Sequence, residues 1–319
     1  MNYFMRFDCW GGNHPIINMQ LEKAILNSIG LELNIYSYKQ QYEAVSLLKS
    51  VNNVLDYNVH IRKSGELGFY FSDDIPERNR KYVESAIEFL TGTSGTGYIV
   101  HDETDPYLTT LSDSRLNSYI NALKLIEPYL KNLNNNLYIE FSNTLEINYY
   151  LKLIRQISHT NMEHIGSCID IGHVYYFYRV KQGYTKNESI EKLKQFIVDV
   201  KNTGVPVYYH VHDCDPYNPH PWYGVADHKC IGDGEIGIDG FRRIIPLLEN
   251  ENLNLEILPV SNYHDAILTE SETQKLIAYA KKHNLDAEKQ IRDGKIIKQT
   301  LDDIVKSRNI LDSLVKEKR

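Results

Sequence analysis

Residues 137–170, LYIEFSNTLEINYYLKLIRQISHTNMEHIGSCID, join two short β-rich runs, LYIEF at 137–141 and SCID at 167–170, through a longer segment. A strand, a segment of helical length and a second strand are the parts of one βα repeat. The same alternation extends from Tyr3 to about Asn284 without a low-complexity linker. The chain is therefore expected to be α/β and built from repeated βα units.

Eight runs have the composition of strands. They are FMRFDC (4–9), LELNIY (31–36), YNVHIR (57–62), YIVHD (98–102), LYIEF (137–141), SCID (167–170), VYYHVHD (207–213) and LNLEIL (253–258). The segments between them carry apolar residues at helical spacing, as at Leu116, Tyr119, Ile120, Leu123 and Ile126.

Eight strands that alternate with helices predict a (β/α)8 TIM barrel over residues 1–284, because parallel neighbours need a crossover and crossovers are right-handed. An open doubly wound sheet is the alternative. The first βα turn, CWGGN at 9–13, lacks the spaced glycines of a dinucleotide site. This absence favours the barrel.

Residues 285–319 form a separate C-terminal helical extension in this prediction. One apolar stripe runs along a segment dense in Lys, Arg and Asp, at Ile297, Leu301, Ile304, Leu311 and Val315. Such a stripe is expected to pack on the chain's own barrel. A contact with a partner chain, which would make a homo-oligomer, is the alternative.

The composition excludes several classes of protein. The 319 residues include 35 Lys+Arg and 42 Asp+Glu, a formal net charge of -7, which argues against a dedicated nucleic-acid binder. No apolar run approaches the roughly 18 residues of a membrane span, and the start lacks a signal sequence. The four cysteines are too sparse for a disulfide framework. We expect a soluble cytoplasmic protein without a membrane partner.

Imidazoles and carboxylates recur where the predicted strands end. In a TIM barrel these ends meet at one face, so the side chains would converge in one mouth. Buried charge is costly unless it is neutralised, and a mixed nitrogen and oxygen ligand set suits zinc, manganese or iron. So many ligands predict two or three divalent ions. The predicted metal ligands are His60, His101, Glu140, Asp170, His173, His210, His228 and Glu256.

Four of the motifs in this region resemble the endonuclease IV family of apurinic endonucleases, within the xylose-isomerase-like barrel superfamily. They are GSCIDIGH (166–173), YYHVHD (208–213), HKCIGDGEIGIDGFRRI (228–244) and LEIL (255–258). The resemblance covers most of the barrel, is strongest from Glu140 to Glu256, and ends before the C-terminal extension.

The resemblance implies three ions. His60, His101 and Glu140 would hold the first, and Glu140, as a bridge, would hold the second with Asp170, His210 and Glu256. His173 and His228 match ligands of the third. The family's Asp-x-His reads here as Ala226-Asp227-His228, so its carboxylate is displaced by one residue or lost. His212 shares the face of His210 by alternation, and we expect it to support a ligand.

Phosphoester hydrolysis is the leading functional hypothesis, because bridged ions that activate a water would use the whole cluster. Sugar isomerisation or epimerisation is the alternative, with Glu140 and Glu256 as catalytic acid and base. It leaves His60 and His101 as pocket residues, and Pro216 stands where ketose epimerases of this superfamily have an Arg.

A multinuclear iron oxygenase and a non-catalytic binding module are further readings. The charge and the altered loops at 141–146 and 216–226 make duplex DNA a poor substrate. A sugar, a sugar phosphate and a nucleic acid all stay open as substrates.

Overall fold

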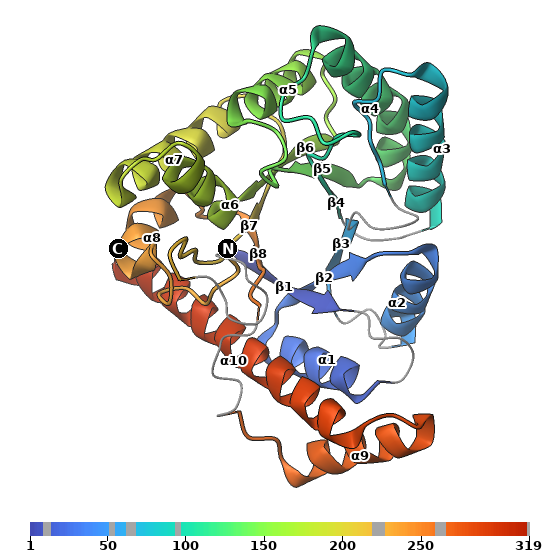
Figure 1. Cartoon of the computed structure of the whole chain (residues 1–319), viewed down its shortest axis with the longest axis vertical. Helices are drawn as coiled ribbons and strands as arrows, with labels where there is room; N and C mark the ends of the chain where they lie inside the picture. Colours follow the sequence, from blue (N-terminus) through green and yellow to red (C-terminus); the bar gives the residue numbers. More distant parts are fainter. Residues whose placement is uncertain are drawn as a thin grey trace.

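The computed structural model describes residues 1–8, 14–50, 55–61, 68–92, 97–218, 227–258 and 266–317. Eight parallel strands pair in chain order and close into a barrel, with the helices outside the ring of strands (Figure 1). The predicted TIM barrel is confirmed. The strands are β1 (Asn2–Asp8), β2 (Gly30–Ile35), β3 (Tyr57–Ile61), β4 (Gly97–His101), β5 (Asn136–Glu140), β6 (Ile165–Asp170), β7 (Val207–His210) and β8 (Asn252–Leu255).

The predicted strands at 207–213 and 253–258 each run three residues too far at the carboxyl end, whereas those ending at 36, 102 and 141 run one residue too far. β7 stops at His210 because Asp213 forms an antiparallel bridge with Lys229, which turns the chain out of the barrel. β8 stops at Leu255, and the amide of Leu258 donates to the carbonyl of His228. The loop after β7 therefore takes the hydrogen bonds that would have extended both strands. The predicted strand residues Cys9 and Arg62, and the turn at 9–13, lie outside the described residues.

The helices follow the predicted crossovers. They are α1 (Pro15–Asn27), α2 (Tyr38–Ser50), α3 (Pro76–Gly92), α4 (Asp113–Leu133), α5 (Ile147–His159), α6 (Ile171–Tyr176), the π-helix η2 (Phe177–Lys181), α7 (Lys186–Lys201), α8 (Gly237–Ile244), the 3-10 helix η3 (Ile245–Leu247), α9 (Glu270–His283) and α10 (Ala287–Glu317). Ser112 caps the start of α4, where its side chain accepts a hydrogen bond from the amide of Arg115.

The C-terminal helix α10, 31 residues long, lies along the outside of its own barrel against α1, α8 and α9 (Figure 1). Its stripe buries Ile297, Leu301, Ile304 and Leu311. The hydroxyl of Ser307 accepts from the amide of Ile231 at 3.1 Å, which ties the helix to the loop after β7. The helix thus covers barrel helices rather than the mouth.

The barrel interior is filled in layers. A small apolar cluster of inward-facing side chains consists of Phe4, Ile99, Tyr138, Cys168 and Tyr208. The strand residues that alternate with these face outwards and belong to the larger core beneath the helices. In the next layer towards the carboxyl ends, the inward positions are polar. That layer holds the predicted site.

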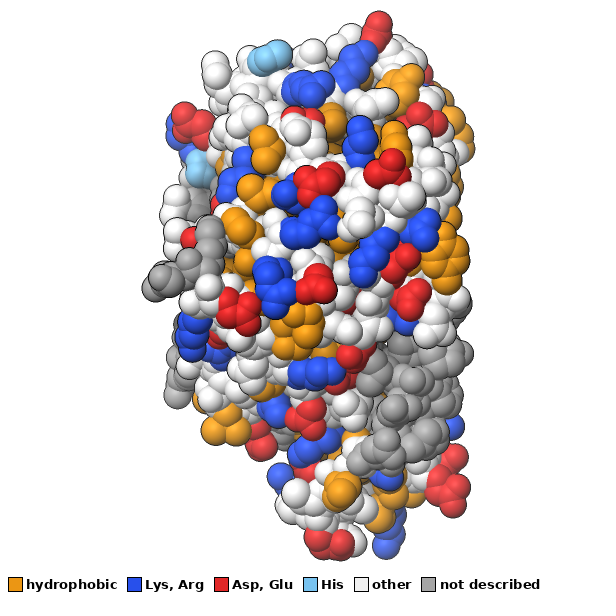
Figure 2. All heavy atoms as spheres, turned by 90° about the vertical axis from the view of Figure 1, so that its left-hand side faces the viewer, with side chains coloured by type: hydrophobic (Ala, Val, Ile, Leu, Met, Phe, Trp, Pro, Cys, Tyr) orange, Lys and Arg blue, Asp and Glu red, His pale blue; other side chains and the backbone are white. Residues whose placement is uncertain are grey.

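The surface over α7 and α8 carries basic and acidic side chains side by side (Figure 2). A face that binds the phosphate backbone of DNA would concentrate Lys and Arg instead. Within the described residues, no helix is long and apolar enough to cross a membrane.

Candidate metal centre

The strands aim the predicted ligands into the barrel. His101, Glu140, Asp170 and His210 each end their strand, two residues beyond a side chain of the apolar interior cluster. His60 is the last residue but one of β3. The register pairs His101 with Glu140 and Asp170 with His210, so neighbouring strands bring these groups to one level. All eight predicted ligands lie in one cluster at the carboxyl ends of the strands.

Glu140 is at the centre of this cluster and is fully buried. Its Oε2 lies 3.1 Å from Nε2 of His60, 3.5 Å from Nε2 of His101 and 3.4 Å from Nδ1 of His210. Its Oε1 lies 3.5 Å from Nδ1 of His173. Among the described residues neither oxygen accepts a hydrogen bond. A buried carboxylate ringed by imidazoles, without a hydrogen-bond donor, fits a cation ligand.

Two overlapping ligand groups share Glu140. His60, His101 and Glu140 form the first; Glu140, Asp170, His210 and Glu256 form the second, and within each the ligand atoms lie within 4.8 Å of one another. Nδ1 of His210 is 2.9 Å from Oε2 of Glu256 and 3.8 Å from Oδ2 of Asp170. Nitrogen and oxygen donors of this kind are common ligands of zinc, manganese and iron.

A third group includes the displaced carboxylate. Oδ2 of Asp227 lies 3.2 Å from Nε2 of His173, and its Oδ1 lies 3.8 Å from Nε2 of His228. The backbone of His228 is left-handed, with φ of 59°. Asp227 thus places a carboxylate beside both histidines of this group. Ala226 lies outside the described residues.

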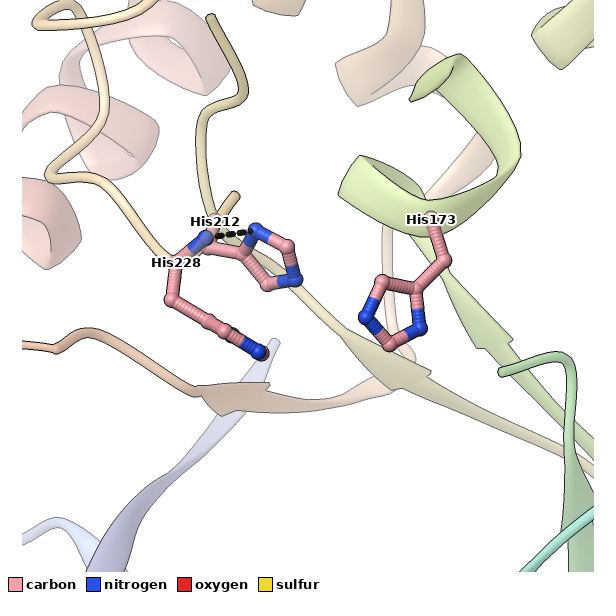
Figure 3. Close-up of side chains that lie close together, drawn as sticks. All are labelled: His173, His212 and His228. Atoms are coloured by element: carbon pink, nitrogen blue, oxygen red, sulfur yellow. Dashed lines mark hydrogen bonds between the residues drawn. The ribbon is translucent and has the colours of Figure 1, made fainter. Parts of the chain in front are cut away.

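His212 is the third imidazole here, and ligand atoms of His173, His212 and His228 lie within 4.8 Å of one another. Its ring is 4.2 Å from that of His228, and His173 faces both rings from α6 (Figure 3). The amide of His228 donates to Nδ1 of His212 at 2.8 Å, the dashed line in Figure 3. The proton of His212 is then on Nε2, 3.0 Å from the carboxylate of Asp170. His212 is thus placed to orient Asp170, in keeping with the supporting role expected of it.

Gly172 gives His212 its space. A Cβ at position 172 would lie 2.0 Å from Cε1 of His212, far inside van der Waals contact. Gly172 immediately precedes His173 in the run Asp-Ile-Gly-His, so the close approach explains why this sequence places a glycine in the first turn of α6.

Sequence reasoning missed two groups in the mouth. Glu32, fully buried in β2, has Oε1 3.0 Å from Nδ1 of His60 and Oε2 3.0 Å from Nε2 of His210. Arg6 of β1 has its guanidinium 3.9 Å from Glu256, with the side chain 18% exposed. The sequence does contain a clue to Glu32: an acidic residue stands between Leu31 and Leu33 in a predicted strand. Because side chains alternate along a strand, Glu32 faces the barrel interior when the two leucines face the helices.

The charges of the cluster are strongly coupled. Burial alone would raise the pKa of Glu140, but the imidazoles of His210, His101 and His60 outweigh it and hold that pKa well below its usual range. Burial opposes the charge on Asp170 as well, yet His173 and His212 lower its pKa to about 2. Glu140 and Asp170 are therefore ionised at neutral pH, as metal ligands must be.

Two imidazoles respond in opposite directions. Burial lowers the pKa of His173, but Asp170 and Asp227 outweigh this effect and raise it to about 10. Burial and the neighbouring His212 hold the pKa of His228 well below its usual value. His228 thus has a free lone pair at neutral pH, whereas an ion at the third group would have to displace a proton from His173.

No protein-family model and no curated protein matches the chain. Solved structures with a similar fold include L-ribulose 3-epimerase, at 13% identity over 99% of this chain and 97% of that one, with a TM-score of 0.59. A D-tagatose 3-epimerase-like protein matches at 16% identity over 99% and 97%, with a TM-score of 0.57.

A fusion of a xylose isomerase-like TIM barrel with a 4-hydroxyphenylpyruvate dioxygenase matches at 12% identity over 89% of this chain and 45% of that one, with a TM-score of 0.53. The chain therefore shares the fold of xylose-isomerase-like TIM barrels. Its likeness to endonuclease IV in particular remains a prediction.

Proposed function

We propose that this protein is a divalent-metal-dependent enzyme that epimerises or isomerises a sugar or sugar phosphate. The observation that carries the proposal is the buried group of Glu140, Asp170, His210 and Glu256, in which two glutamates approach the same nitrogen of His210. The similarity in fold to sugar epimerases over nearly the whole chain supports it. This similarity favours sugar epimerisation or isomerisation, the alternative hypothesis from the sequence, over phosphoester hydrolysis.

The four ligands would hold one ion. When bound there, it would polarise a substrate carbonyl and acidify the adjacent carbon. In an epimerisation, one of Glu140 and Glu256 starts ionised and accepts the proton from that carbon. The other starts protonated and delivers its proton to the opposite face, so the total charge of the pair does not change.

Two further side chains would bind the substrate. His173, whose side chain is 13% exposed, borders the mouth beside Glu140 and would contact a sugar hydroxyl. Arg6 supplies a cation near Glu256, where it would face a substrate oxygen or phosphate. It could replace the arginine that the sequence lacks at Pro216.

Solvent deuterium tests the proposal directly. The metal-loaded protein is incubated in deuterated water with a panel of ketoses and ketose phosphates, and deuterium at carbon is measured by mass spectrometry. Glu140→Gln and Glu256→Gln should each abolish incorporation, because each removes a proton carrier. Glu146→Gln is the matched control, since Glu146 is exposed and caps α5 without a side-chain hydrogen bond. Full incorporation by either active-site variant would contradict the mechanism.

Phosphoester hydrolysis is the second candidate, favoured by one specific observation. His60 and His101 surround Glu140 at 3.1 and 3.5 Å, although an isomerase with a single ion has no need of them as ligands. Two or three ions would activate a water and stabilise a leaving oxygen. Cleavage of DNA that contains an abasic site, without deuterium incorporation into any sugar, would support this function over isomerisation.

A further inference from the structure

Glu32 is a carboxylate that neither mechanism uses. It lies in the middle of β2 between Leu31 and Leu33 and is completely buried, as are both of its histidine partners. Each of its oxygens contacts a different imidazole at 3.0 Å: Oε1 contacts His60 and Oε2 contacts His210. A charge buried at this depth is stable only with such partners.

The chemistry of these two contacts assigns the protons. A carboxylate offers acceptors only, so Nδ1 of His60 and Nε2 of His210 must each carry a hydrogen and donate it to Glu32. A nitrogen that carries a proton cannot bind a metal. The nitrogens that remain as ligands are therefore Nε2 of His60 and Nδ1 of His210.

The same two nitrogens face the centre of the site. Nε2 of His60 lies 3.1 Å from Oε2 of Glu140, and Nδ1 of His210 lies 3.4 Å from that oxygen. The orientation that satisfies Glu32 on one side of each ring is thus the orientation that directs a lone pair at Glu140 on the other.

We propose that Glu32 is a positioning residue that fixes the ring orientation and the tautomer of His60 and His210 together, one from each of the two ligand groups that share Glu140. The inference rests on the metal centre of the proposed function but not on which reaction that centre performs. Hydrogen-bond partners of ligating histidines typically change metal affinity 10- to 100-fold when they are removed. Here a single carboxylate serves both groups, so one substitution should weaken both.

A competing role is direct ligation. Ligand atoms of Glu32, His60, His210 and Glu256 also lie within 4.8 Å of one another. An ion in that position would have to use the nitrogens that face Glu32, which would turn the lone pairs of both rings away from Glu140. The two roles predict opposite tautomers and different ion counts.

Three variants separate these possibilities. Glu32→Gln keeps the size of the side chain but offers one acceptor and one N–H donor, so it satisfies only one imidazole N–H and forces the other ring to change. Glu32→Asp keeps two acceptors and should rescue part of the effect. Ile99→Val is the control, because Ile99 belongs to the apolar cluster of the barrel interior.

The experiment measures Zn²⁺ affinity by competition with a chelator, ion stoichiometry, and the tautomers of the two rings by proton–nitrogen correlation spectra. We expect wild-type protein loaded with Zn²⁺ to carry hydrogens at Nδ1 of His60 and Nε2 of His210. Glu32→Gln should bind Zn²⁺ about 10- to 100-fold more weakly and change one tautomer. Ile99→Val should retain the wild-type affinity.

An unchanged affinity in Glu32→Gln, or hydrogens at the opposite nitrogens in the wild-type protein, would overturn the positioning role. The loss of one ion with the others bound as before would assign Glu32 as a ligand instead. The wild-type spectrum alone tests the proposal even if Glu32→Gln does not fold. Wild-type protein that binds no Zn²⁺ would refute the metal centre itself, which distinguishes that failure from a failure of Glu32.

Discussion

Replacing Gly172 with alanine tests how the site is built, because the new methyl group meets the ring of His212 and not the backbone. The added Cβ would lie 2.0 Å from Cε1 and 2.4 Å from Nδ1 of that ring. The ring cannot stay in place. To move, it must give up its contact with Asp170 at 3.0 Å and the hydrogen bond from the amide of His228 at 2.8 Å.

The free energy follows from these contacts. Overpacking a tight interior costs about 1–3 kcal/mol, and leaving a buried polar group without its partner costs about 1–3 kcal/mol more. Alanine in place of glycine in a helix returns about 1 kcal/mol. We therefore expect Gly172→Ala to lower the free energy of unfolding by about 1–5 kcal/mol.

The assay is urea unfolding of the four members of a double-mutant cycle: wild type, Gly172→Ala, His212→Ala and the double variant. Removing the imidazole makes room for the methyl group. In the His212→Ala background the glycine substitution should therefore be neutral or stabilising by up to about 1 kcal/mol, which reverses its sign. Equal destabilisation in both backgrounds would show that the clash with His212 is not the cause.

Three further perturbations probe the metal, the C-terminal helix and the strand layer. Removing metal with a chelator should lower the melting temperature, and restoring Zn²⁺ at 100 times its Kd should stabilise the fold by about 2.7 kcal/mol; identical melting with and without metal contradicts a folded-state site. Burial raises the pKa of Asp303 from 3.8 to about 6. Between about pH 4 and 6 the folded protein therefore binds this proton more tightly than the unfolded chain does, so the free energy of unfolding falls as the pH rises. The stability of Asp303→Asn relative to wild type should therefore increase over that window in pH-dependent urea melts, and a constant difference would argue against it. The hydroxyl of Tyr150 contacts the carbonyl of Ile139 at 2.6 Å and Oγ of Ser167 at 2.7 Å, so Tyr150→Phe should cost about 1–3 kcal/mol in thermal unfolding, unlike Tyr129→Phe on the exposed face of α4.

The fold was predictable because its signals are local. Each strand is a short β-rich run and each crossover has an apolar period, so the count of eight strands already implied a closed barrel. The positions of His60, His101, Glu140 and Asp170 in their runs were enough to place them at one face. Strand ends were less certain because competing hydrogen bonds, such as the bridge of Asp213 with Lys229, come from loops.

Parts of the site depended on contacts that local sequence does not record. Glu32 meets a histidine 28 residues away and another 178 residues away, and only closure of the barrel brings the three together. Asp227 contacts His173 at 3.2 Å, and the residue that follows it, His228, has a left-handed backbone. Comparison with the Asp-x-His spacing alone leaves Asp227 as displaced or lost, because a sequence motif contains no information on backbone conformation.

The sequence by itself determined the class of fold, the face on which chemistry occurs and most of the side chains that could bind metal, because alternation and strand order are one-dimensional properties. Only the tertiary structure decided how these side chains pair: which nitrogen of His60 and His210 faces Glu140, which carboxylate supports them, and how His212 fits over Gly172. These choices depend on separations of about 3 Å between residues far apart in the chain, since hydrogen bonds and metal ligation are lost within an ångström of misplacement.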